Sequence, residues 1–339
     1  MSLPLKINSL TSEVLELLDP YLCFKSSVQV YHNKLIIEGE EVEVTGKLHI
    51  FSTGKAASYE LEAFKRILSE SEYDFEISQE IAYTKEGNTV KNSDFIQLEG
   101  THPVVSKSNL DLTKKFLIYL EKIYPDDTLI FLLSGGASAL LELPIEGLSF
   151  EQMQKTHLEL LSSGKSINEM NRIRKSLSQL KDGGLLNYIS SKNIIQFITC
   201  DIPNENLNDV SSGPLLSENK KSNPLTFKNQ SASKLLSKLC SSGLSSTKRI
   251  EGKVYDCLLD EMESDLRDNL PQANEIHISG GEATIQIPKN SGLGGRNTHF
   301  VLSFAHKIYQ DPSMQNIHIM SFGTDGGDGP TDAAGAYIN

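Results

Sequence analysis

The chain has 339 residues, 38% of them apolar, and a formal net charge of −12. This length accommodates two domains, and the acidic balance argues against a nucleic-acid or anionic-membrane surface, because those partners require clustered Lys and Arg. The apolar runs are shorter than the about 20 residues that a membrane span requires, and the N-terminus lacks a signal-peptide core, so we expect a cytoplasmic protein. The four cysteines form no CxxC pair, which argues against a zinc site or a disulfide framework.

Strands and helices alternate over the first part of the chain. The expected elements are, in order, a helix at 8–25 that ends near Pro20, a hairpin or two short strands within 28–44, a strand at 48–51, a helix at 56–69, a strand at 77–83, a helix at 109–123 and a strand at 128–133. The last strand is an unbroken apolar run, typical of a strand buried on both faces of a parallel sheet. The alternation predicts an α/β fold with a parallel sheet that helices cover on both faces, in three layers.

Two of these strands end in small-residue turns. The strand at 128–133 is followed by Ser134-Gly135-Gly136-Ala137-Ser138, and a helix is expected to begin at Ala137. The glycines bring backbone N–H groups close to a ligand, and a helix N-terminus favours an anion. The strand at 48–51 ends in the same manner, with Gly54 and Lys55 before a helix. Ligands bind at the carboxyl ends of strands in open α/β sheets, so both turns are candidates for a ligand site. The turn at 134–138 is either an anion cradle or a plain turn without a ligand, and Lys55 either reaches a ligand or is a solvated side chain.

Two single residues are further candidates. Asp201 follows a strand expected at 193–199, a position suited to a metal ion or to a substrate hydroxyl group. His102 precedes Pro103 in a loop with extended backbone, where it either contacts a ligand or fills the loop.

Two helices are predicted within 149–185. Capping-box pairs begin both, the first at Ser149 and the second at Ser166. The second helix is expected to continue to Asp182-Gly183-Gly184, where the glycines suit a left-handed cap. A polar stripe lies beside its apolar face and consists of Asn171, Arg174, Ser178 and Lys181. The stripe either faces a cleft or belongs to a surface helix with ordinary basic residues.

The polar segment at 215–230 marks the expected domain boundary, which divides the chain into domains 1–218 and 219–339. In the second domain, a strand at 275–279 runs into Gly280-Gly281-Glu282, with 283–288 as its hairpin partner.

Two glycine-rich loops complete the set of candidates. Gly294, Gly295, Arg296 and Asn297 precede a helix expected at 298–309, with Asn297 as its N-cap, and this arrangement suits a phosphate group. The loop 323–332 follows a strand at 317–322 and contains three aspartates among four glycines, as a magnesium site or a general base requires. The candidate metal ligands are Asp201, Glu282 and Asp328.

In their order along the chain, these motifs resemble the class II glycerate kinases, whose C-terminal part is called the MOFRL domain and whose members are sometimes named hydroxypyruvate reductases. The resemblance covers nearly the whole chain and rests on 53–57, 100–104, 134–140, 171–184, Asp201, 212–214, 279–282, 294–297 and 323–336. It implies two α/β domains, the first of them Rossmann-like, with an active-site cleft between them.

The resemblance also implies an activity, the phosphorylation of D-glycerate by ATP with Mg²⁺, usually to 2-phosphoglycerate. By this likeness Lys55 and Arg296 would be the catalytic cations that neutralise the transferring phosphoryl group, and Asp325 the base or positioning residue for the substrate hydroxyl. The turn 134–138 would bind either nucleotide phosphates or the glycerate carboxylate. The remaining binding candidates are His102, Asn171, Arg174, Lys181, Gly294, Gly295 and Asn297.

Some residues depart from the family pattern. Ser176 and Asp182 replace the usual His and Gly, and we expect the chain to be shortened between Pro214 and Ser279 and at its C-terminus. These departures favour a non-catalytic metabolite-binding homologue, which the presence of the three catalytic candidates opposes. A nicotinamide-dependent hydroxypyruvate reductase is a further alternative, but no strand leads into the GxGxxG turn that grips a dinucleotide. A homodimer is left open.

Overall fold

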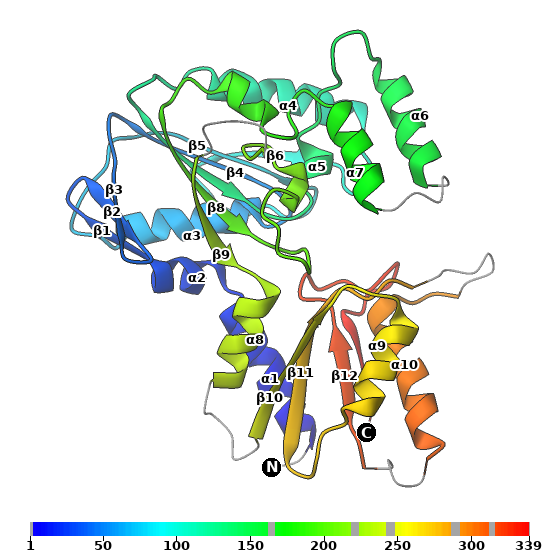
Figure 1. The fold of residues 1–339 in the computed structure, drawn as a ribbon. Coiled ribbons are helices and arrows are strands. Elements are labelled where there is room, and N and C mark those ends of the chain that lie inside the picture. The colour runs from blue at the N-terminus through cyan, green and yellow to red at the C-terminus, as the bar shows by residue number, and fades with distance from the viewer. Residues whose placement is uncertain are drawn as a thin grey trace. The chain divides into compact units, whose positions relative to one another are not determined.

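The computed structural model describes residues 3–161, 167–217, 224–241, 248–285, 292–311 and 316–338. The chain forms two units (Figure 1): a larger unit, Leu18–Ser231, and a smaller unit that combines Met1–Leu17 with Ala232–Asn339. These units differ from the domains expected at 1–218 and 219–339. Helix α1 (Leu3–Leu17) packs with α8 (Ala232–Ser241) in the smaller unit, and strand β9 (Leu225–Gln230) pairs with a strand of the larger unit.

The larger unit is built on a parallel sheet of six strands in the order β6-β5-β4-β7-β8-β9. Besides β9, the strands are β4 (Leu48–Thr53), β5 (Ile77–Lys85), β6 (Ile96–Gly100), β7 (Thr128–Leu133) and β8 (Asn193–Thr199). Every residue of β4 and β7 is buried, so the prediction of central strands from their apolar runs is confirmed. From β4 the chain proceeds to one edge of the sheet and then adds β7, β8 and β9 on the other side of β4, so the strand order reverses between β4 and β7.

Helices cover both faces of this sheet, which confirms the three-layer α/β prediction (Figure 1). On one face lie α2 (Pro20–Ser27) and α3 (Ala57–Ser69); on the other lie α4 (Lys107–Leu120) and α5 (Ala137–Leu140). Alternate residues of each strand serve the two faces. In β7, Ile130 and Leu132 join the core under α3, whereas Leu129 and Phe131 join the core under α4.

The remaining elements of the larger unit are small. An antiparallel meander consists of β1 (Val28–Tyr31), β2 (Lys34–Ile37) and β3 (Glu40–Glu43), so the expected hairpin has a third strand. After α5 come α6 (Phe150–Leu161), α7 (Ile167–Ser176) and the short 3₁₀ helices η1 (Gly184–Tyr188) and η2 (Val210–Ser212).

In the larger unit one expectation is corrected and two strands are additional. The helix expected at 8–25 is two helices, because Asp19 caps a new helix at Pro20 by accepting the Tyr21 N–H at 2.8 Å. The edge strands β6 and β9 were not predicted. Both contain polar residues and are buried only in part, so they lack the continuous apolar run of a central strand.

The smaller unit has two pairs of strands. Strand β10 (Lys248–Tyr255) runs parallel to β11 (Glu275–Gly281), and β12 (Ile319–Phe322) runs antiparallel to β13 (Gly335–Ile338). The hairpin expected between 275–279 and 283–288 is therefore wrong where the structure describes it, since Thr284 bridges Leu258; residues 286–288 lie outside the described part. The core of this unit forms where α9 (Leu259–Asp268) and α10 (Arg296–Tyr309) pack with β12.

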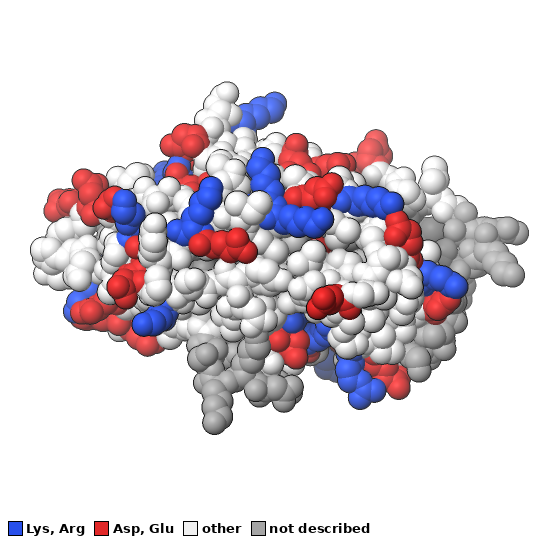
Figure 2. Space-filling model, turned by 90° about the horizontal axis from the view of Figure 1, so that it is seen from above, with Lys and Arg blue, Asp and Glu red and all other residues white. Residues whose placement is uncertain are grey.

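The charge distribution on the surface and the composition of the helices concern two possible partners, nucleic acid and membrane. On the face drawn in Figure 2, acidic side chains are interspersed among the basic ones. Within the described ranges, no helix combines the length and the apolar composition that crossing a membrane requires.

Candidate functional site

The reversal of strand order brings the two candidate turns, at 54–55 and 134–138, side by side. Gly54 and Lys55 follow β4, and the turn that starts at Ser134 follows the neighbouring strand β7. The Lys55 N–H donates to the Gly135 carbonyl at 2.9 Å, and the Ala56 N–H donates to Ser134 Oγ at 3.2 Å. In open parallel sheets the carboxyl edge at such a reversal is where ligands bind. The two turns together therefore form the candidate site of the larger unit.

Glycine is required in this turn because other groups approach its backbone closely. A Cβ atom on Gly136 would lie 2.9 Å from His102 Nε2 and 3.0 Å from Lys55 Cγ, and the residue has a left-handed φ of +86°. A Cβ atom on Gly135 would lie 1.6 Å from a carboxylate oxygen of Asp201. The predicted residues Lys55, His102 and Asp201 thus surround one glycine turn.

Ser211 is a residue of this site that the sequence reasoning missed. Its hydroxyl group accepts the Ala137 N–H at 3.0 Å and donates to the Ser134 carbonyl at 3.0 Å. Ser211 adopts a left-handed φ of 49° at the start of a small-residue run, Ser211-Ser212-Gly213. That run is the signal in the sequence, and its role is to fix the turn after β7.

The second helix expected within 149–185 is α7, and it ends at Ser176. The prediction of a helical polar stripe that continues to Lys181 is therefore wrong beyond this residue. Asn171 and Arg174 lie on α7 and are partly buried. Lys181 lies beyond the helix, where it forms an ion pair with Glu142, and the two side chains are 5% and 0% exposed. The helix stops because the next residues pair with another segment: Ser178 forms an antiparallel bridge to Pro144. The Lys181 ammonium is thus part of the interior.

Lys181→Met is expected to lower the free energy of unfolding by about 3–5 kcal/mol, because it leaves the Glu142 carboxylate buried without its counter-charge. Urea unfolding measures this difference. As a control, Lys114→Met removes an exposed lysine whose nearest carboxylate, on Asp111, lies 3.9 Å away, and it should change stability by less than about 1 kcal/mol. Equal effects of the two substitutions would contradict a structural role for the buried pair.

In the smaller unit, predicted residues gather at the N-terminus of α10. Asp328 is 2% exposed, and its carboxylate accepts the Asn297 and Thr298 N–H groups at 2.9 and 2.8 Å. It also accepts Asn297 Nδ2 at 3.1 Å and the Thr298 hydroxyl at 2.8 Å. Burial would raise the pKa of Asp328, but the hydrogen bonds from Thr298 and Asn297 outweigh it and hold this pKa below its ordinary value. Asp328 thus caps α10 from outside, and Gly295 replaces the expected Asn297 as N-cap.

Arg296 and Asp325 lie at the same end of this unit. Arg296 is the first residue of α10 and forms an ion pair with Glu282, with side chains 45% and 52% exposed. A Cβ atom on Gly323 would lie 3.1 Å from Asp325 Oδ1 and 3.6 Å from Asn297 Nδ2. Asp325 is itself exposed. The catalytic candidates are thus divided between the units, with Lys55 in the larger one.

The predicted metal ligands fit a metal ion only in part. In the part of the chain that the structure describes, no three His, Cys, Asp or Glu side chains form a cluster that would hold a metal. Glu282 pairs with Arg296 and Asp328 caps α10, so neither is suited to the predicted ligand role. Asp201 and Asp325 are exposed carboxylates, one in each unit. Because Mg²⁺ at kinase sites is bound by one or two carboxylates together with substrate phosphates, the exposed Asp201 beside the glycine turn is the predicted ligand that still fits this role.

Asp328→Ala is expected to destabilise the protein by about 1–3 kcal/mol at pH 7, because four hydrogen bonds to the carboxylate are lost. The folded-state pKa lies below the unfolded value of about 3.9, so the stabilisation is complete above that pH and is lost as the pH falls through the folded pKa. Urea unfolding of both proteins at pH 7 and near pH 3 should show the difference shrinking at low pH. Asp332→Ala, an exposed change in the same loop, is the control; a pH-independent difference would contradict the capping role.

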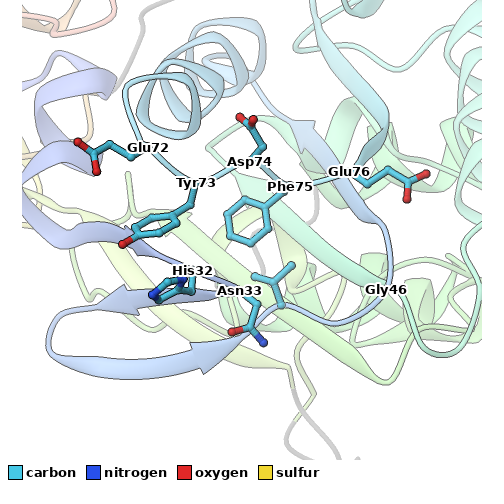
Figure 3. Close-up of a pocket in the computed structure, with 9 residues that line it drawn as sticks. His32, Asn33, Gly46, Glu72, Tyr73, Asp74, Phe75 and Glu76 are labelled. Carbon is cyan, nitrogen blue, oxygen red and sulfur yellow. The ribbon is translucent and has the colours of Figure 1, made fainter.

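A hollow of about 530 Å³ lies elsewhere in the larger unit (Figure 3). His32 and Asn33 line it from the β1–β2 turn, and Tyr73 and Glu76 line it from the segment before β5. This segment enters the amino end of β5, whereas the candidate site follows the carboxyl ends of β4 and β7. None of the predicted site residues lines this hollow.

Comparisons with known proteins relate most of the chain to two family models and to named relatives. The model of a domain of unknown function, DUF4147, matches residues 6–238, more than half of the chain, and the MOFRL family model matches residues 275–339. A glycerate 2-kinase of Pyrococcus horikoshii is 27% identical over 97% of this chain and 84% of its own. A putative hydroxypyruvate reductase of Agrobacterium vitis is 26% identical over 86% of each chain.

A solved structure, that of glycerate kinase from Thermotoga maritima, has the same fold. It aligns with a TM-score of 0.76 at 25% identity, over 98% of this chain and 85% of its own. The matched models, in the order DUF4147 then MOFRL, agree with the order of motifs along the sequence. The chain therefore belongs to the family of class II glycerate kinases.

Proposed function

We propose that this protein transfers a phosphoryl group in line from ATP to D-glycerate and that the product is 2-phosphoglycerate. The observation that carries the proposal is the contact of the two anion-binding turns at the reversal of strand order, where the Lys55 N–H donates to the Gly135 carbonyl at 2.9 Å. The relative named glycerate 2-kinase supports both the substrate and the hydroxyl group that accepts the phosphoryl group.

Both units contribute residues to the proposed reaction. The Lys55 ammonium and the Arg296 guanidinium neutralise the charge that spreads over the phosphoryl oxygens in the transition state. Asp325 orients the attacking hydroxyl group or accepts its proton. The turn 134–138 binds an anionic group, either the nucleotide phosphates or the glycerate carboxylate. Mg²⁺, when bound to the nucleotide, would supply further positive charge, and Asp201 is the residue of the larger unit that would hold it.

An assay with ATP, Mg²⁺ and D-glycerate, followed by phosphorus NMR of the product, tests the proposal. Formation of ADP and 2-phosphoglycerate is the expected result, whereas 3-phosphoglycerate would correct the position of transfer. Oxidation of NADH with hydroxypyruvate would support a reductase instead. Binding of ADP without turnover would indicate a non-catalytic homologue.

A further inference from the structure

A buried carboxyl group lies beneath the two turns, on the α3 face of the sheet. Glu60, in the first turn of α3, is 2% exposed. Its Oε1 atom accepts a hydrogen bond at 2.6 Å from the hydroxyl group of Thr199, the last residue of β8 and two residues before Asp201. The buried hydroxyl group of Ser134, directly after β7, lowers the pKa of the same carboxyl group. Glu60 thus connects α3, which begins beside Lys55, with the ends of two strands.

The surroundings of Glu60 favour its neutral form. Burial raises the pKa of Glu60 to about 7, against the opposing effect of the Thr199 and Ser134 hydroxyl groups. The groups that face the Glu60 carboxyl group and lower its pKa are these two hydroxyl groups. The charged residues of the adjoining turns, Lys55 and Asp201, do not contribute to the shift of this pKa. In the described structure the second oxygen, Oε2, has no hydrogen-bond partner. A buried polar atom in that state requires an explanation.

The position of Glu60 gives a physical reason for keeping the carboxyl group neutral. The turn after β7 is proposed above to bind an anion, and a carboxylate buried beneath it would repel a phosphate group through a medium that screens charge poorly. A neutral carboxyl group causes no such repulsion and still accepts the Thr199 hydrogen bond.

We propose that Glu60 is a positioning residue, which in its neutral form holds the turn after β7, the lysine turn and the end of β8 in the arrangement that binds the phosphate groups of a nucleotide, and in its ionised form weakens that binding. This inference rests on the function proposed above and deepens it, because it assigns the turn after β7 to the nucleotide phosphates and not to the glycerate carboxylate. It assigns to the site a pH dependence that comes from a residue without substrate contact.

Glu60→Gln tests the charge, because glutamine keeps the shape and the acceptor but cannot ionise. For the native protein, KM for ATP should rise on the order of tenfold between pH 6 and pH 8.5, with a much smaller change in kcat. Glu60→Gln should show a nearly flat KM that equals the native value at pH 6. The matched control is Glu263→Gln, at a carboxyl group that is also 2% exposed but lies on α9 and pairs with Lys307. A Glu60→Gln profile that follows the native one would overturn the inference.

Two measurements decide the inference without turnover. Calorimetry of ADP binding in buffers of different ionisation enthalpy should show more proton uptake near pH 7 for the native protein than for Glu60→Gln. In Glu60→Leu, hydrogen exchange of the Lys55 and Ala56 amides should accelerate at least several-fold, whereas Glu263→Leu should leave it unchanged. If D-glycerate is not phosphorylated, the kinase proposal fails while these measurements still apply. Equal proton uptake or unchanged exchange would remove the positioning role.

Discussion

Arg296→Ala should lower kcat for D-glycerate phosphorylation by about a thousandfold or more while the Tm changes little. The guanidinium group is proposed to stabilise charge that develops in the transition state, where one well-placed arginine contributes on the order of 10³ or more in rate. Its structural contribution is small because its ion pair with Glu282 is half exposed, and such pairs stabilise proteins by less than about 1 kcal/mol. Steady-state kinetics and thermal unfolding measure the two effects.

The control for this change is Arg267→Ala, at an exposed arginine of the same unit on α9, which should leave kcat unchanged. Near-normal turnover of Arg296→Ala would remove this residue from the chemistry. The double variant with Lys55→Met adds a test of joint action. If both cations act on one phosphoryl group, the double variant should lose much less than the product of the two single losses, because residues that act as a unit are not additive.

Gly135→Ala should lower kcat by on the order of a hundredfold, since a displacement of about 1 Å within an active site has an effect of that size. The added Cβ atom would lie 1.6 Å from a carboxylate oxygen of Asp201, so this side chain must move away from the turn. The backbone φ of Gly135 is not positive, so alanine introduces no left-handed strain at this position. Kinetics and a crystal structure of the variant would measure the loss and the displacement.

Gly280→Ala is the matched control, because the nearest atoms to its added Cβ atom lie 3.7 Å away, at ordinary contact distance. It should retain native turnover. Full activity of Gly135→Ala would mean that the position of Asp201 beside the turn does not matter to the reaction.

Features that depend on neighbouring residues along the chain could be predicted. The capping box at Ser149 forms as expected: its N–H donates to Gln152 Oε1 at 2.8 Å, and the Gln152 N–H donates to Ser149 Oγ at 3.2 Å. The second expected box, at Ser166, lies outside the described residues. The strand, glycine turn and short helix at 128–140 also follow from local sequence, because an apolar run and two glycines restrict the backbone by themselves.

Features that depend on distant segments were missed or misjudged. Asp328 belongs to a loop whose composition is that of a metal site. Its carboxylate instead caps a helix that begins 32 positions earlier, at Arg296 (328 − 296 = 32). Lys181 has helical spacing from Arg174, yet it is paired in the interior with Glu142, on the far side of α6 and α7 in sequence. In both cases a long-range partner satisfies the charged group.

The sequence by itself determined the α/β class, the central strands, the glycine turns at their carboxyl ends and the family, because backbone preference and apolar periodicity are properties of short segments. The tertiary structure decided which turns meet. Lys55 and Gly135 are 80 positions apart (135 − 55 = 80), and they touch because the sheet reverses its strand order between β4 and β7. The tertiary structure also decided the burial of Glu60. Other strands cover this carboxyl group, and its neighbours in the sequence do not reveal that they will.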